Sequence, residues 1–191
     1  PKTMVSKVGG KHLTMLMENM INNNNQKMTE GNYKCSANDA RVLKEQYTYT
    51  RAAVSKWCPS TTDTDRFLLE SENYTLENDT ATIKLRTERF LIPEALFEPS
   101  LLSKYDVLEK DRYEREILSV QELCRRTTNA IDTDDRKLDI YRSLVCIGGG
   151  LDFPCFELRL HRELRRMKLR ILKIHSGDNK EEVVNKSISS T

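Results

Sequence analysis

A run of three glycines is the feature of this sequence whose residue types most clearly suggest chemistry. Gly148, Gly149 and Gly150 follow an uncharged apolar run, 144–147, and come shortly before Pro154 and a helical pattern. Glycine lets a backbone adopt positive φ or lie flat against a ligand, and a helix N-terminus attracts phosphate. The turn therefore suggests a phosphate or nucleotide site. A tight turn without any ligand would explain the glycines equally well.

A charged helix face is the second candidate. A helix predicted over 39–56, with Ser36 or Asn38 as its N-cap, carries Arg41, Lys44 and Glu45. These side chains share neighbouring surface because residues three and four apart meet on a helix. Taken alone, the charges fit an ordinary solvated helix face at least as well as a binding site. A further glycine pair, at 9–10, stands at the start of another predicted helix.

Several regular elements are predicted to position these residues. The helix over 11–21 has apolar residues at helical spacing, and the run 144–147 suits a strand covered on both faces. Pro154 fits the first turn of a helix whose apolar face consists of Phe156, Leu160, Leu164 and Met167. Segments 73–76 and 80–85 alternate β-branched and polar residues around a turn, which predicts a hairpin.

The stretch 104–126 is the most highly charged helix candidate. Its apolar stripe is continuous only from Ile117 onward, so we expect 103–116 to project from the body as a polar helix or loop. Basic residues also dominate 159–173, where Glu163 is the single acid. They predict a local basic surface, which is either the C-terminal half of an ordinary helix matched to its macrodipole or a patch that binds a partner.

Composition limits the possible functions. The 191 residues include 31 Lys and Arg against 29 Asp and Glu, so no overall field favours nucleic acid or membrane. The 5 cysteines are widely spaced, with no pair at the spacing of metal ligands. This pattern favours reduced thiols in a cytosolic or nuclear protein and argues against a zinc site.

One long motif resembles a known family. The segment 87–102, TERFLIPEALFEPSLL, resembles the signature ERF-x-x-PEALF-x-PS of the actin and actin-related protein family almost residue for residue. Three further motifs follow the family's order and spacing: GGKHLT at 9–14, Arg41-x-x-Lys44-Glu45, and the GG-x-x-x-x-P turn at 148–154. Together they resemble the nucleotide-binding second half of the family over about 8–164.

The resemblance implies an α/β fold of the actin-like ATPase (ribonuclease H-like) type. One lobe would be represented here, together with a small helical subdomain. Residues 8–30 and 87–175 would form the large subdomain and 31–86 the small one. Residues 103–126 would be a charged insertion, longer than in conventional actin.

The resemblance also implies a nucleotide site and a cofactor, ATP with Mg²⁺ or Ca²⁺. Carried over from the family, the binding positions are Gly10, Arg41, Lys44, Glu45, Gly148, Gly149 and Phe153. A planar guanidinium can stack on a base, and a carboxylate can accept hydrogen bonds from ribose hydroxyls. No catalytic residue or metal ligand is expected here, because the family's aspartate-containing phosphate loops lie in its other half.

Some positions depart from the family pattern. Phe153 stands where tyrosine is common, Cys155 replaces a glycine, and residues 150–151 replace small hydroxylated ones. The chain is therefore expected to be a divergent actin-related protein. Some segments resemble the member of the branch-nucleating complex, and others resemble nuclear remodelling or dynactin subunits, so the resemblance favours the group over any one member.

Two functions follow from the resemblance. One is an ATP-binding cytoskeletal or complex subunit whose nucleotide-dependent closure shapes its fit to partners, either actin or other actin-related subunits. The other is a scaffold subunit of a chromatin-remodelling or dynactin-type complex that no longer binds nucleotide. Neither requires direct contact with nucleic acid or membrane. The expected location is the cytoplasm and its cytoskeleton, with the nucleus as the alternative.

Overall fold

Helices and short strands alternate along the chain. The computed structural model describes residues 3–23, 33–50, 72–75, 82–108, 117–131, 136–137, 140, 144–167 and 174–175. The helices are α1 (Gly10–Asn23), α3 (Ala37–Tyr47), α5 (Glu88–Glu94), α6 (Ser100–Lys104), α8 (Val120–Asn129) and α10 (Phe156–Arg166). The strands are β1 (Glu72–Thr75), β2 (Thr82–Leu85), β3 (Leu144–Val145) and β4 (Ile174–His175). The mixture of helix and strand agrees with the class predicted from the sequence.

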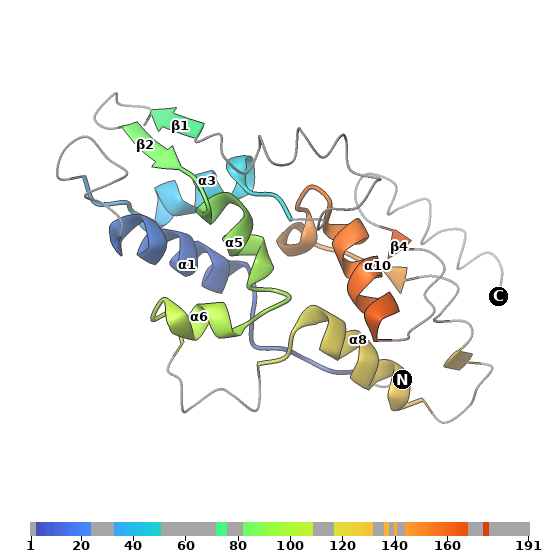
Figure 1. Ribbon diagram of the computed structural model, residues 1–191. Helices are drawn as coiled ribbons and strands as arrows, with labels where there is room; N and C mark the ends of the chain where they lie inside the picture. Colours follow the sequence, from blue (N-terminus) through green and yellow to red (C-terminus); the bar gives the residue numbers. More distant parts are fainter. Residues whose placement is uncertain are drawn as a thin grey trace.

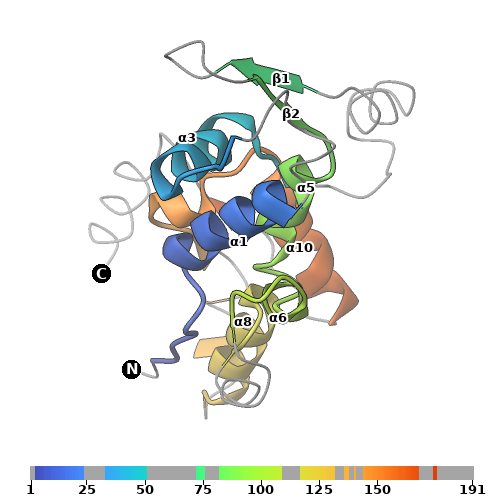
Figure 2. The same cartoon turned by 90° about the vertical axis from the view of Figure 1, so that its left-hand side faces the viewer.

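Helix α1 packs against α3 and α5 (Figure 1). Its apolar stripe is fully buried, as the sequence predicts, and consists of Leu13, Leu16, Met17, Met20 and Ile21. Figure 2 shows the β1–β2 hairpin at one end of the molecule and α6 and α8 at the other. The packing against α3 holds the glycine-bearing N-terminus of α1 beside the second half of that helix.

Helix α3 begins as predicted but ends early. Ser36 is its N-cap and forms a capping box with Asp39, in which each side chain accepts a hydrogen bond from the other residue's backbone N–H. The expected helix over 39–56 was wrong at residues 48–50, which leave the helix, and residues 51–56 lie outside the described part of the chain. The amide of Tyr49 donates to the carbonyl of Arg89 instead, at 2.9 Å. A contact distant in the sequence thus ends the helix.

The hairpin is confirmed within the described residues. Strands β1 and β2 pair antiparallel, with Tyr74 opposite Ile83 and Thr75 opposite Thr82. Ile83 and Leu85 are buried while Thr82 and Lys84 are not, which is the alternation expected of a strand with one covered face. The predicted turn at 77–79 lies outside the described residues.

The stretch 104–126 is not one helix. Helix α6 ends at Lys104, and α8 starts only at Val120, where the Ser119 side chain accepts a hydrogen bond from the Glu122 amide at 3.4 Å. Of the segment expected to project from residue 103, Lys104 and Asp106 are exposed, but the expectation was wrong at the buried Val107. Its amide donates to the carbonyl of Leu102 at 2.8 Å. Residues 109–116 lie outside the described part of the chain.

A cluster of charges on α8 predicts a measurable pH dependence. Arg125 donates two hydrogen bonds to the Glu122 carboxylate, at 2.6 and 2.7 Å, and Arg126 donates a third. Mainly through the Arg125 bonds, the pKa of Glu122 falls from its usual 4.5 to about 2. A lowered pKa means that the carboxylate stabilises the fold above about pH 4.5 and loses this contribution as the pH falls toward 2. Glu122→Gln should therefore give a shallower fall of the unfolding free energy over this range in urea titrations. Parallel curves for the two proteins would contradict the assignment.

The strand before the glycine turn is shorter than predicted. Strand β3 covers Leu144 and Val145 and pairs in parallel with β4. Both side chains are half-buried, and Ile147 is 66% exposed, so the predicted strand over 144–147 with two covered faces was wrong. Of residues 144–147, only Cys146 is buried. In the described part of the sheet, β4 is the strand paired with β3. Because β3 is paired on one side there, its side chains are only partly buried.

Helix α10 buries the face that its sequence predicts. Phe156, Leu160 and Leu164 are each at most 1% exposed, and Met167 packs against them. Pro154 lies in the turn before the helix rather than in its first turn, because Cys155 is the N-cap and has a left-handed φ of 64°. Residues 136, 137 and 140, which are described before β3, are also helical.

The predicted basic surface on α10 is smaller than expected. The Arg159 guanidinium is largely buried, donating to the Glu94 carboxylate at 2.5 Å and lying 5.1 Å from the centre of the Phe97 ring. It therefore fastens α10 to α5 and does not belong to an exposed patch. Arg165 and Arg166 are exposed, and Arg166 pairs with Glu163 at 2.8 Å. The basic residues 168–173 lie outside the described residues.

Candidate functional site

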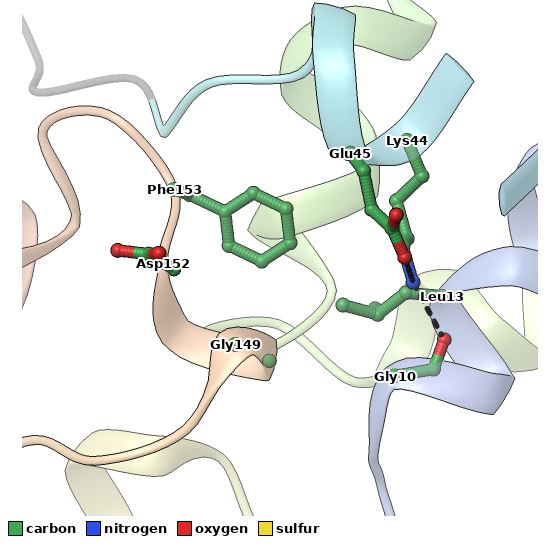
Figure 3. A pocket seen from close by; sticks show the side chains of 8 residues that line it. Gly10, Leu13, Lys44, Glu45, Gly149, Asp152 and Phe153 are labelled. Carbon is green, nitrogen blue, oxygen red and sulfur yellow. Dashed lines mark hydrogen bonds and ion pairs between the residues drawn. The ribbon is translucent and has the colours of Figure 1, made fainter. Parts of the chain in front are cut away.

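A pocket of about 310 Å³ lies where the N-terminus of α1, the second half of α3 and the glycine turn meet (Figure 3). Its lining residues are Gly10, Leu13, Lys44, Glu45, Gly149, Gly150, Asp152 and Phe153. Of the residues predicted from the sequence, Gly10, Lys44, Glu45, Gly149 and Phe153 are among them. Three stretches that are distant in the sequence therefore meet at one place.

Lys44 connects two walls of the pocket. Its Nζ donates to the Gly10 carbonyl at 3.4 Å and to the Thr14 hydroxyl at 3.1 Å, so α3 is fixed to the first turn of α1. The side chain is only 11% exposed. A Cβ on Gly10 would lie 3.8 Å from this Nζ, which is ordinary contact. An ammonium group has three N–H donors, and two are engaged in these bonds, so one is left for a ligand.

Glu45 offers an accessible carboxylate at the pocket edge. Its side chain is 54% exposed, and its oxygens lie 3.9 Å from Lys44 Nζ and 3.9 Å from the Arg41 guanidinium. Exposed ion pairs at this separation are weak, so the carboxylate can still accept hydrogen bonds from a ligand. Arg41 itself is 57% exposed and donates to Asn38 at 3.4 Å. Arg41 does not line the pocket, so the structure shows no contact through which it would play its predicted binding role.

The glycine turn forms the opposite wall. Gly148 has φ of 103°, a conformation that favours glycine, but it does not line the pocket. Gly149 begins a short 3-10 helix, Gly149–Leu151, and the Asp152 amide donates back to its carbonyl at 3.3 Å. A Cβ added to Gly149 or Gly150 would have no heavy atom within 4 Å. The turn therefore presents bare backbone to an open space.

An aromatic ring and a leucine give the pocket its apolar part. In Figure 3 the Phe153 ring points toward Leu13 and Glu45, whereas the Asp152 side chain points away from them. The sequence predictions missed Leu13 and Asp152, and Gly150 was predicted only as part of the glycine turn. Leu13 was assigned to the core, where it is indeed buried. Its position one helical turn after Gly10 is the sequence signal that could have revealed its second role.

The lining suits a flat, partly polar molecule. An aromatic face, a leucine, a carboxylate acceptor and one ammonium donor are the usual components of a pocket that binds a ring with hydroxyl groups. Lys44 is the one cation among the described lining residues, so the pocket offers little to neutralise several negative charges. No group of three His, Cys, Asp or Glu side chains that could hold a metal is found in the described ranges. Nor is any described helix long and apolar enough to cross a bilayer.

Comparison with known proteins identifies the family. The family model described as Actin matches residues 1–188. The chain belongs to the actin family. This family membership confirms the resemblance carried by the segment 87–102, and it implies the actin-like ATPase fold for the chain.

Curated relatives of this actin-family chain include actin-related protein 2 from several organisms. The Drosophila melanogaster protein is 31% identical over 147 residues, covering 74% of this chain and 32% of the relative. The Arabidopsis thaliana protein is 27% identical over 158 residues, 83% of this chain and 36% of the relative. The Caenorhabditis briggsae protein is 32% identical over 142 residues, which cover 72% of this chain and 31% of the relative. The chain thus spans about a third of the length of these relatives.

Proposed function

We propose that this chain supplies the base and sugar part of an ATP site in an actin-related protein. The observation that carries the proposal is the meeting of Gly10, Lys44, Glu45, Gly149 and Phe153 around one pocket. The family resemblance assigns all five of these residues to the nucleotide. An aromatic ring, a carboxylate and bare glycine backbone fit the groups of a nucleoside.

Each lining residue has a role that its chemistry allows. The Phe153 ring and Leu13 provide apolar surface for the base, and Glu45 accepts hydrogen bonds from the ribose hydroxyls. Lys44 holds α3 against Gly10 and has one remaining N–H for the ligand. The backbone of Gly149 leaves room for the sugar and first phosphate. ATP with Mg²⁺ or Ca²⁺ is the cofactor inferred from the family, and the described residues offer no cluster of ligands for the ion itself.

Replacing Glu45 with alanine tests the sugar contact. In the full-length protein, Glu45→Ala should weaken ATP binding by about 1–3 kcal/mol, because charge-assisted hydrogen bonds to the ribose would be lost. Titration of a fluorescent ATP analogue measures the change. Gln46→Ala is the matched control, since Gln46 is the next residue on α3, is exposed and does not line the pocket. Equal affinities for the Glu45 variant and the control would remove the support for this contact.

The single lysine predicts how residues 1–191 behave alone. A triphosphate carries several negative charges, and the described lining residues offer one cation against them. We therefore expect residues 1–191 alone to bind ATP weakly and no more tightly than adenosine, while the full-length protein prefers ATP with its divalent ion. Isothermal titration with both ligands measures this. Tight, phosphate-dependent binding by residues 1–191 would show that phosphate groups are recognised within them.

At the level of the whole protein, we propose an ATP-binding subunit of the cytoskeleton. Its nucleotide would control closure of a two-lobed body and hence the fit to actin or other actin-related subunits. Support for this level comes from family membership and from the likeness to actin-related protein 2. The scaffold alternative is favoured by Arg41, which lies outside the pocket. No ATP binding by the full-length protein would favour the scaffold, whereas wild-type affinity in the Glu45 variant would remove only the assigned ribose contact.

A further inference from the structure

A short extended segment, residues 48–50, ties together the two walls of the pocket. It follows directly from the end of α3, which carries Lys44 and Glu45. At its far end the Thr50 amide donates to the carbonyl of Pro154 at 2.9 Å. Pro154 comes directly after Phe153, so one backbone hydrogen bond joins the segment to the wall that carries the aromatic ring.

Both ends of the segment are held in place. The Thr48 hydroxyl donates to the Lys44 carbonyl at 2.5 Å, which fastens the segment to the last turn of α3. Midway, the Tyr49 amide donates to the Arg89 carbonyl at 2.9 Å, and Arg89 Nε donates to the Tyr47 carbonyl at 3.1 Å. An extended chain rises about 3.3 Å per residue, so a link this short leaves little slack between the walls.

We propose that Thr50 is a positioning residue that sets the separation of the pocket walls and thereby the size of base that the pocket admits. The inference rests on the proposed nucleotide function and adds a determinant of specificity to it. Thr50 does not line the pocket, so it acts through Pro154 and its neighbour Phe153. The packing of α10 holds the base of this wall, and the Thr50–Pro154 bond ties the wall to the end of α3, so loss of the bond would let the wall move outward from α3.

The backbone of Thr50, and not its side chain, carries this role. The residue is 1% exposed, and its hydroxyl has no hydrogen-bond partner among the residues that the structure describes. Thr50→Val therefore keeps the amide and the shape of the side chain while removing an unsatisfied polar group. Thr50→Pro removes the N–H donor and the bond to Pro154. The two substitutions separate the backbone bond from the side chain.

The experiment compares two nucleosides in the full-length protein. The Kd values of adenosine and of the bulkier N6-benzyladenosine are measured by isothermal titration for the unaltered protein, Thr50→Val and Thr50→Pro. Thr50→Pro should lower the affinity for adenosine about tenfold and the affinity for N6-benzyladenosine much less. A tenfold change is an ordinary size for the coupling between two sites in a protein. Thr50→Val should keep the ratio of the unaltered protein. An equal loss for both nucleosides in Thr50→Pro, or no loss, would overturn the inference.

A second measurement needs no substitution, in case Thr50→Pro does not fold. Linkage is reciprocal, so if the Thr50 bond favours the ligand, the ligand must protect that bond by the same factor. Saturating adenosine should slow hydrogen exchange of the Thr50 amide by about tenfold in the unaltered protein. Unchanged exchange would overturn the inference while leaving the nucleotide function standing. If the unaltered protein binds neither adenosine nor ATP, the proposed function itself fails, and the inference with it.

Discussion

Replacing Phe156 with alanine is expected to lower the free energy of unfolding by about 3–5 kcal/mol, the usual cost of removing a buried aromatic side chain. Phe156 is 1% exposed, and its ring centre lies 5.4 Å from that of Phe97. As the first residue of α10, it also fixes the start of the helix that follows the glycine turn. Urea denaturation followed by circular dichroism measures the loss.

Leu158 is the matched control for this prediction. It lies on the same helix two residues further on, and it is 43% exposed. Because much of its side chain already contacts water, Leu158→Ala should change the unfolding free energy by less than about 1 kcal/mol. Similar losses for the two variants would mean that α10 does not bury the face described above, and the position of the glycine turn would then lose its main support.

Replacing Gly149 with valine is expected to cause the largest loss of ATP affinity among the substitutions considered. An added Cβ meets no heavy atom of the protein within 4 Å, so the fold should tolerate the change. The same Cβ would occupy the pocket space that the sugar and first phosphate need. The loss should exceed that of Glu45→Ala and reach at least about 3 kcal/mol, or more than a hundredfold in Kd.

Gly9→Val is the control for the valine substitution. A Cβ at Gly9 also has open space around it, and Gly9 does not line the pocket. Gly148 is unsuitable because its φ of 103° would strain any other residue. Both valine variants should melt close to the unaltered protein, and only the Gly149 variant should lose ATP. Unchanged affinity in the Gly149 variant would leave the pocket without a role in nucleotide binding.

The elements that the sequence predicted well are those whose pattern is local. The stripe of α1, the face of α10 and the alternation of β2 depend on residues a few positions apart, and all three are confirmed. The failures occur where a distant partner decides. Helix α3 stops where the Tyr49 amide donates to the Arg89 carbonyl, and the start of α8, besides its local Ser119 cap, is fixed by the Val120 amide donating to the Leu96 carbonyl. No local pattern contains either partner.

The candidate site shows the same division. The family motifs predicted which stretches would meet, and the pocket contains residues from all three of them. They did not predict that Arg41 would turn toward Asn38 and remain outside, or that Leu13 would border the pocket while buried in the core. Both outcomes depend on the direction of a side chain on its helix, which residue spacing alone leaves open.

The three glycines of the turn differ in the constraint that would keep each of them a glycine during evolution. Gly148 is required by the backbone itself, since its φ of 103° is costly for other residues whether or not a ligand is bound. Gly149 and Gly150 have open space around an added Cβ, so under the proposed function only the ligand keeps them small. A lineage that abandoned nucleotide binding would therefore retain the first glycine and accumulate larger residues at the other two. Variation at these three positions among natural relatives then becomes a record of which lineages still bind nucleotide.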